Sequence, residues 1–214
     1  MKSTTRSNRV VFWEVDTQAD FMLPGGKLYV PGAEKRIAQM KRLVAAVRAG
    51  KVFLVSSADQ HAQDDPEFQR FPAHCVRGTS GAEILPELTA EILLRIPNEE
   101  KFAVPGNLDD FQQAVIEKQT LDVFDNPNTE KLLARFPQEA EFVVFGVVTE
   151  FCVNLAAKGL LNRGRRVALV TDAIETIEPR EGERTLRELA RQGARLVTTD
   201  KAVALVDAPV RQTA

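Results

Sequence analysis

Cysteine, histidine and the larger aromatic residues are scarce in this sequence. Its 214 residues include two cysteines, two histidines, one tryptophan and one tyrosine. Two cysteines cannot form the disulfide framework of a small secreted protein, so we expect a cytoplasmic protein in a reducing compartment. The polar N-terminus, MKSTTRSNR, lacks the apolar segment of a secretory signal and supports the same expectation.

A strong net charge and long hydrophobic runs are also missing. Lysine and arginine number 28 against 30 aspartates and glutamates, which gives a net charge of −2. This balance provides no positive field that would attract nucleic acid. The longest apolar run, Phe142 to Val148, is far shorter than the ~20 residues of a membrane-spanning helix. We therefore expect neither nucleic acid nor a membrane as a partner.

What is present is typical of a globular protein: 44% hydrophobic and 27% charged residues. At about 150 residues per domain, the length predicts a single domain over residues 1–214, with a flexible N-terminal tail at 1–8. A chain of this length can bury a sizeable core without a disulfide or a structural metal.

Six short apolar segments have the composition of buried strands. Most are continuous hydrophobic runs, which is typical of strands covered on both faces of a parallel sheet. Helical patterns lie between them, at Ala33–Ala49, Glu150–Arg163 and Pro179–Gln192, each followed by glycine. The alternation predicts an α/β fold, a doubly wound, six-stranded parallel sheet with helices on both faces. The predicted strands are Arg9–Val15, Val52–Ser57, Ala114–Lys118, Glu141–Val148, Arg166–Thr171 and Ala194–Thr198.

Reactive side chains stand at the C-terminal ends of these strands. Asp16, Lys118 and Cys152 each come at or soon after such an end, and parallel strands deliver those ends to one edge of the sheet. Cys152 would also lie in the first turn of a helix capped by Thr149, where the helix dipole lowers the thiol pKa. Taken singly, the three residues are better explained as a turn aspartate, a lysine that reaches solvent and an inert buried cysteine.

If they converge, the three residues are suited to nucleophilic catalysis. Asp16 would take the proton from the Cys152 thiol and later pass it to a leaving amine, while a neighbouring ammonium would favour both anions. The backbone amides of Val148 and Cys152 would form an oxyanion hole. Phe21 and Phe71 are candidates for sandwiching a flat substrate ring, although core packing explains them equally well.

Both histidines of the chain fall in one cluster. His61 lies two residues after Asp59, and His74 returns from a long segment, about Gln60 to Leu108, that we expect to be irregular. An Asp/His/His set suits Zn²⁺, Fe²⁺ or Mn²⁺, with Zn²⁺ favoured, and Glu67 is a candidate fourth ligand. The alternative is that both histidines make only loop hydrogen bonds.

Taken together, these motifs resemble the isochorismatase-like cysteine hydrolase family, and most closely its nicotinamidase branch. The matching segments follow the family order over about residues 9 to 175. They are VDTQADF at 15–21, DQH at 59–61, FPAHCVRGTSGAE at 71–83, EK at 117–118 and GVVTEFCV at 146–153.

The resemblance implies a six-stranded parallel sheet, a Cys-Asp-Lys triad, the metal triplet named above and a cis peptide at Val147–Val148. Relatives hydrolyse carboxamides or carbamoyl groups through a thioester, those without the cysteine act on isochorismate, and many form homo-oligomers. In nicotinamidases the metal holds the pyridine nitrogen. The favoured reaction is therefore nicotinamide and water to nicotinate and ammonia.

Two departures leave other functions open. Phe71 stands where nicotinamidases usually carry tryptophan, and the segment after Lys118 differs from the usual pattern. A hydrolase of another small carboxamide or carbamoyl compound is the second interpretation. A non-catalytic metal or small-molecule binding protein of the same fold is the third, and a metal-activated water with Cys152 as a bystander is a fourth.

Overall fold

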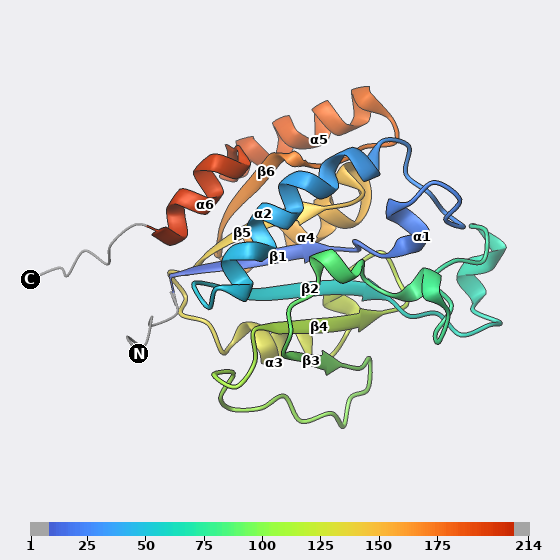
Figure 1. Ribbon diagram of the computed structural model, residues 1–214, viewed down its shortest axis with the longest axis horizontal. Coiled ribbons are helices and arrows are strands. Elements are labelled where there is room, and N and C mark those ends of the chain that lie inside the picture. The colour runs from blue at the N-terminus through green and yellow to red at the C-terminus, as the bar shows by residue number, and fades with distance from the viewer. Residues whose placement is uncertain (1–8, 208–214) are drawn as a thin grey trace, which may run out of the picture.

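A parallel sheet of seven strands runs through the middle of the protein (Figure 1). The computed structural model describes residues 9–207, so the tail expected at 1–8 lies outside the described residues. The strand order is β3-β4-β2-β1-β5-β6-β7, and every neighbouring pair is parallel. The strands are β1 (Val10–Val15), β2 (Phe53–Asp59), β3 (Leu93–Ile96), β4 (Gln113–Lys118), β5 (Glu141–Gly146), β6 (Arg166–Ile174) and β7 (Arg195–Val197).

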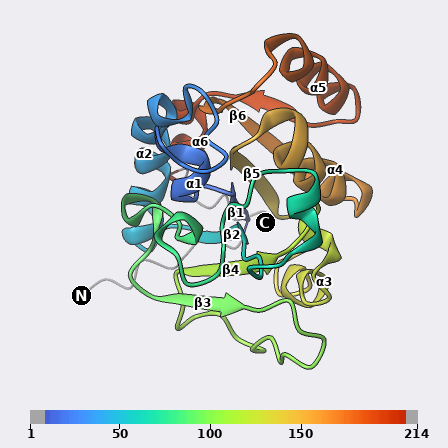
Figure 2. The same ribbon diagram turned by 90° about the vertical axis from the view of Figure 1, so that its right-hand side faces the viewer.

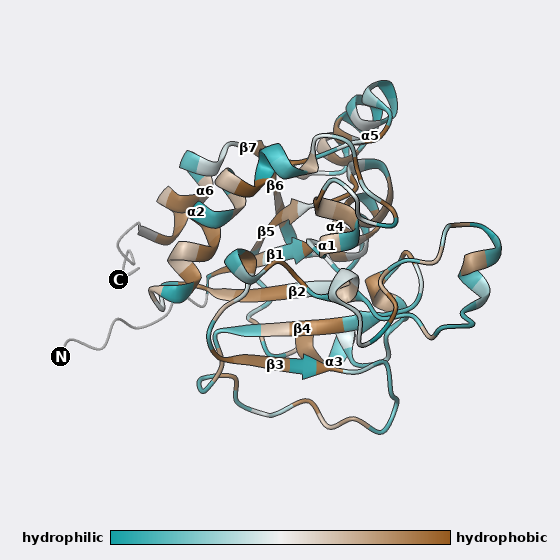
Figure 3. Cartoon of the chain, turned by 45° about the vertical axis from the view of Figure 1, so that its right-hand side comes forward, coloured by the Kyte–Doolittle hydropathy of each residue, from teal (hydrophilic) through white to brown (hydrophobic). Residues whose placement is uncertain are grey.

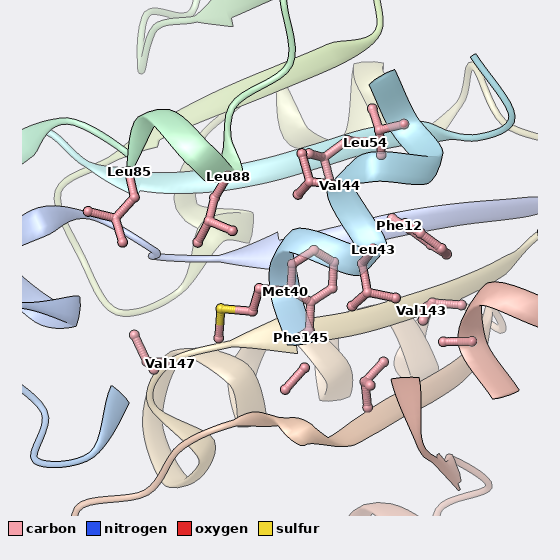
Figure 4. Packing of buried hydrophobic residues seen from close by; sticks show 14 of the residues in the cluster. Phe12, Met40, Leu43, Val44, Leu54, Leu85, Leu88, Val143, Phe145 and Val147 are labelled. Atoms are coloured by element: carbon pink, nitrogen blue, oxygen red, sulfur yellow. The ribbon is translucent and has the colours of Figure 1, made fainter. Parts of the chain in front are cut away.

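Helices cover both faces of the sheet, as the continuous apolar strands predict (Figure 2). Along β1, Phe12 packs into one core with α2 and α6, and Trp13 packs into a second core with α3 and α4. Figure 4 shows the first core, where Phe12 and Phe145 meet side chains of α2. The helices are α1 (Ala19–Met22), α2 (Ile37–Arg48), α3 (Thr129–Leu133), α4 (Asn154–Asn162), α5 (Pro179–Arg191) and α6 (Thr199–Asp207).

Hydropathy follows this layering. In Figure 3 the strands carry mainly hydrophobic residues, whereas the outer helix α5 is largely hydrophilic. Among the described residues no helix combines the length and the apolar character that crossing a membrane requires.

The sheet has one strand more than the six predicted. The additional strand, β3, lies inside the segment from 60 to 108 that we expected to be wholly irregular. It has four residues, LLRI, and pairs only with β4, so it forms one edge of the sheet. Four residues carry too little periodicity to be recognised as a strand from sequence.

Element boundaries differ where the site begins. The predicted strand Glu141–Val148 ends at Gly146, and the predicted helix from Glu150 starts instead as a π-helical turn, Thr149–Val153, ahead of α4. Gly146 has a φ of 122°, and a Cβ there would lie 2.0 Å from the carbonyl oxygen of Val15. Only glycine allows β5 to end this close to β1.

A fully buried carboxylate, that of Glu14 on β1, lies within the sheet. It accepts hydrogen bonds from the hydroxyls of Thr17 (2.8 Å) and Ser56 (2.6 Å), and Nε2 of Gln113 lies 3.4 Å away. Burial raises the pKa of Glu14 to about 7, although both hydroxyl hydrogen bonds act against the rise.

Replacing Glu14 by glutamine is expected to make folding stability less sensitive to rising pH. The carboxyl pKa is 4.5 without burial and about 7 in the folded protein. Between these values the folded state holds more protons than the unfolded state, so the free energy of unfolding falls as pH rises. The difference of about 2.5 between the pKa values corresponds to roughly 3–3.5 kcal/mol.

Urea unfolding of wild type and Glu14→Gln at about pH 5 and about pH 8 measures this effect. The variant should gain stability relative to wild type at the higher pH. A stability difference that does not change with pH would show that Glu14 does not titrate in this range.

Candidate active site

Four strand ends meet at the C-terminal edge of the sheet, and each delivers a polar side chain. Asp16 follows β1, and Lys118 and Asp59 stand opposite each other at the ends of β4 and β2. Cys152 follows β5 in the π-helical turn. The convergence expected from the parallel topology is therefore present.

The ammonium group of Lys118 lies at the centre of this cluster. Its Nζ is 3.0 Å from Oδ2 of Asp16 and 3.9 Å from Sγ of Cys152, and it forms an ion pair with Asp59. Lys118 is 1% exposed, which rules out a lysine reaching into solvent. Burial acts to lower the pKa of Lys118, but the two carboxylates outweigh it and raise that pKa well above its usual value.

Asp16 is turned toward the cluster by an unusual backbone conformation. Its φ is 50°, in the left-handed region that aspartate tolerates better than most residues. The hydroxyl of Ser57 donates a 2.6 Å hydrogen bond to Oδ1, which leaves Oδ2 for Lys118. Burial raises the pKa of Asp16, and Lys118 opposes the rise. A carboxyl of raised pKa is better suited to accept and return a proton than an ordinary aspartate.

The chain between the end of β5 at Gly146 and Cys152 is called the nucleophile turn below. It has the cis peptide bond at Val147–Val148 that the resemblance implied. Within the described part of the chain, the Val148 N–H donates to no backbone carbonyl, which leaves it free for an oxyanion. The prediction that Thr149 caps the helix is wrong. Its hydroxyl donates instead to the carbonyl of Glu175, 2.7 Å away, because a π-helical turn and not an α-helix starts here.

Cys152 is 8% exposed, and its Sγ contacts the ammonium group of Lys118. Burial raises the pKa of the Cys152 thiol well above its usual value, although Lys118 acts to lower it. The expectation of a thiol pKa lowered by a helix dipole is therefore wrong, since burial dominates. A thiol that is protonated at rest requires a base, and Asp16 lies beside it. Cys75, which the sequence left as structural, is buried, and its N–H donates to Asp20 at 2.7 Å.

The candidate metal ligands lie together beside this cluster. Oδ2 of Asp59 is 3.6 Å from Nε2 of both His61 and His74. The other ring nitrogens have partners of their own: Nδ1 of His61 lies 3.0 Å from Asp65, and Nδ1 of His74 lies 2.7 Å from the carbonyl of Pro72. Outer contacts of this kind are typical of the second ring nitrogen of a metal-binding histidine. They leave both Nε2 atoms facing the Asp59 carboxylate.

This donor set fits a divalent metal. Nε2 of His61 is buried without a hydrogen-bond partner, which is costly unless a ligand satisfies it. Two imidazole nitrogens and one carboxylate oxygen suit zinc and also iron or manganese. Burial acts to raise the pKa of Asp59, but Lys118 together with His61 and His74 outweighs it and keeps this carboxylate ionised. A divalent cation would also offset the net negative charge of Asp16 and Asp59, which Lys118 alone only half neutralises.

Glu67 lies next to this set but belongs to a different group. It lies close to His61 and Asp65 in a second group of possible ligands, which shares only His61 with the triplet of Asp59, His61 and His74. Its side chain lines the cavity, and burial raises the pKa of its carboxyl group. Glu67 as a fourth ligand therefore stays a prediction.

A cavity of about 120 Å³ opens onto Cys152, Asp59 and His74. Phe21 and Phe71 both line it, and their ring centroids lie 5.4 and 6.4 Å from that of His74. Val148 lines it as well, and Leu121 contributes a wall from the segment after Lys118 that departs from the nicotinamidase pattern. The remaining apolar walls were not anticipated from the sequence: Leu28, Val30, Phe151 and Ile177.

Three supporting residues were also missed. Ser57 orients Asp16, Asp65 orients His61, and the side-chain amide of Gln18 bonds both the N–H and the carbonyl of Asp59 at 2.7 Å. Gln18 lies within the recognised motif at 15–21 and Ser57 lies two residues before the motif at 59–61, and these positions were the available signal.

Comparisons with known proteins agree with this geometry. Nicotinamidase of Escherichia coli is 24% identical over 209 residues, which covers 86% of this chain and 92% of that protein. The zinc complex of Pyrococcus horikoshii pyrazinamidase has a TM-score of 0.71 at 26% identity and covers 89% of this chain and 99% of that one. N-carbamoylsarcosine amidase of Thermoplasma acidophilum shares the fold, with a TM-score of 0.70 at 22% identity over 90% of this chain and 97% of that one.

The isochorismatase domain matches residues 11–95 and 95–201, which is most of the chain. The motifs at the strand ends, the parallel sheet and this match agree with one another. The chain therefore belongs to the isochorismatase family.

Proposed function

We propose that this protein is a metal-containing cysteine amidohydrolase whose favoured reaction converts nicotinamide and water to nicotinate and ammonia. The coarser assignment, a hydrolase of amide C–N bonds, follows from the family and from the nicotinamidase and pyrazinamidase relatives. The observation that carries the proposal is the contact of one buried ammonium, that of Lys118, with Asp16, Asp59 and Cys152.

The first half of the reaction uses the thiol and its base. Asp16 takes the proton from Cys152, and the thiolate attacks the carbonyl carbon of the amide. The N–H groups of Val148 and Cys152 hold the oxygen that becomes negative. As the intermediate collapses, the C–N bond breaks, and Asp16 returns the proton to the amine, which leaves as ammonia.

The second half releases the acid. Water adds to the thioester on Cys152, with Asp16 taking its proton, and the C–S bond breaks to regenerate the thiol. Lys118 stays protonated throughout, because two carboxylates surround it, and it lowers the energy of each anionic state. Asp59, His61 and His74 would hold the metal, which supplies a Lewis acid next to the cavity.

The cavity favours small, neutral, flat substrates. Its volume of about 120 Å³ lies well below the roughly 300–1,000 Å³ of pockets for drug-sized ligands. Among the described residues that line it there is no lysine or arginine, whereas Asp59 and Glu67 contribute carboxylates. Aromatic walls, and the absence of a lysine or arginine among them to pair with a substrate carboxylate, favour an aromatic carboxamide over a carbamoyl compound that bears a carboxylate.

A second candidate is hydrolysis of another small neutral amide. The wall formed by Leu121 belongs to the segment after Lys118 in which the sequence departs from the nicotinamidase pattern. A non-catalytic binding protein of the same fold would bind such an amide without releasing ammonia.

Removing the nucleophile is the direct test of the mechanism. We expect the metal-loaded protein to release ammonia from nicotinamide and Cys152→Ala to be slower by at least ~1,000-fold, because no other group can form the thioester. Cys75→Ala serves as the matched control and should keep the wild-type rate. Equal rates for wild type and Cys152→Ala would refute thiol catalysis, and chelator-sensitive activity in that variant would indicate a metal-activated water.

Metal content tests the histidine cluster separately. We expect the purified protein to bind about one Zn²⁺ per chain and His74→Ala to lose most of this binding, because only two protein ligands remain. Asp64→Asn, a change of a neighbouring loop charge, should bind like wild type. Elemental analysis after dialysis measures both, and full zinc retention in His74→Ala would exclude this triplet as the site.

Charge discrimination tests the substrate class. We expect kcat/KM for nicotinamide to exceed that for a carboxylate-bearing carbamoyl amino acid by about 100-fold or more, since placing an anion beside Glu67 costs several kcal/mol. Ammonia release from matched concentrations of both compounds gives the ratio. Comparable values for the two substrates would contradict the assignment.

A further inference from the structure

The segment that follows β6, Glu175–Glu178, has no regular secondary structure and lies across the nucleophile turn. Both the N–H and the hydroxyl of Thr149 donate to the carbonyl of Glu175, at 2.8 and 2.7 Å. These bonds anchor the start of the segment beside Val148, the proposed oxyanion donor.

The carboxylate of Glu150 binds the rest of the segment. Its Oε2 accepts a 2.6 Å hydrogen bond from the hydroxyl of Thr176, and its Oε1 accepts from the N–H groups of Ile177 (2.9 Å) and Glu178 (2.8 Å). Three donors on consecutive residues therefore converge on one side chain, which replaces the backbone partners that a strand or helix would provide.

This arrangement sets one wall of the cavity. Ile177 lines the cavity from the bound segment, and Phe151, the neighbour of Glu150, lines it from the nucleophile turn. Both side chains are partly exposed, at 53% and 41%, so little packing holds them in place. The hydrogen bonds of Glu150 fix the distance between these two walls.

Other contacts hold Glu175 and Thr176 from the far side. A Cβ on Gly182 would lie 2.5 Å from the Thr176 hydroxyl oxygen, so α5 packs closely against it. Arg36 donates to the Glu175 carboxylate at 2.9 Å. Neither contact reaches Ile177, whose N–H is held by Glu150.

We propose that Glu150 is a positioning residue that clamps Glu175–Glu178 onto the nucleophile turn and so forms the Ile177 wall of the substrate cavity. Its kinetic consequence depends on the proposed amide hydrolysis. Its structural consequence, restricted access to Cys152, does not depend on any substrate.

Alkylation of Cys152 by iodoacetamide tests the clamp directly, with the modified peptide quantified by mass spectrometry. We expect the rate in Glu150→Ala to rise about 10-fold, which corresponds to ~1.4 kcal/mol. Glu150→Gln keeps an oxygen that can accept from both amides and should stay near wild type. Glu183→Ala, a matched loss of an exposed carboxylate on α5, should not change the rate.

Steady-state kinetics provides the second readout. In Glu150→Ala we expect KM to rise more than kcat falls, because the wall contacts the bound ring while Asp16, Lys118 and Cys152 keep their own contacts. A role in stability alone would lower the melting temperature without this split. Thr176→Val, which removes a single hydrogen bond, should give an intermediate result and serves if Glu150→Ala does not fold.

The outcomes are separable. Alkylation and KM values in folded Glu150→Ala that match those of Glu183→Ala would overturn the clamp. If wild type hydrolyses no amide, the proposed function fails, and the alkylation rates still decide whether Glu150 restricts access to Cys152.

Discussion

The buried ammonium of Lys118 connects every part of the candidate site. It contacts the proposed base Asp16, the proposed nucleophile Cys152 and the carboxylate of Asp59 in the candidate metal triplet while exposing 1% of its surface. Removing it would leave two carboxylates buried near each other without compensation, and breaking such a pair typically costs about 3–5 kcal/mol. The proposed acid–base pair and the candidate metal triplet are therefore coupled through one side chain.

The parallel sheet brings these side chains to one place. Asp59 and Lys118 are register partners at the ends of β2 and β4, and Val15, which precedes Asp16, pairs with Gly146, which precedes the nucleophile turn. Residues more than one hundred positions apart thus become neighbours because the strands end at one edge. The long connection after β2 then returns His74, a candidate metal ligand, to the same edge through a largely irregular backbone.

Much of the fold was predictable from composition. Continuous apolar runs such as those of β1 and β5 indicate strands buried on both faces, and both cores confirm it. The four-residue strand β3 was not predictable, because an edge strand of that length has no distinctive pattern. The π-helical start before α4 also has no signature in the local sequence, and there the Thr149 hydroxyl bonds Glu175 from a distant segment instead of capping a helix.

The sequence by itself determined which reactive groups exist and at which strand ends they stand, because local hydrophobic patterning places Asp16, Asp59, Lys118 and Cys152 after strands. Only the tertiary structure decided their protonation, since the pKa of a thiol or carboxyl depends on burial and on neighbouring charges from distant segments. It also decided the shape of the cavity, whose walls at Leu28 and Ile177 come from irregular segments and whose wall at Phe151 comes from the π-helical turn. The type of each reactive side chain is a property of the local sequence, whereas the distances between these side chains and their burial arise only when the strands assemble into the sheet.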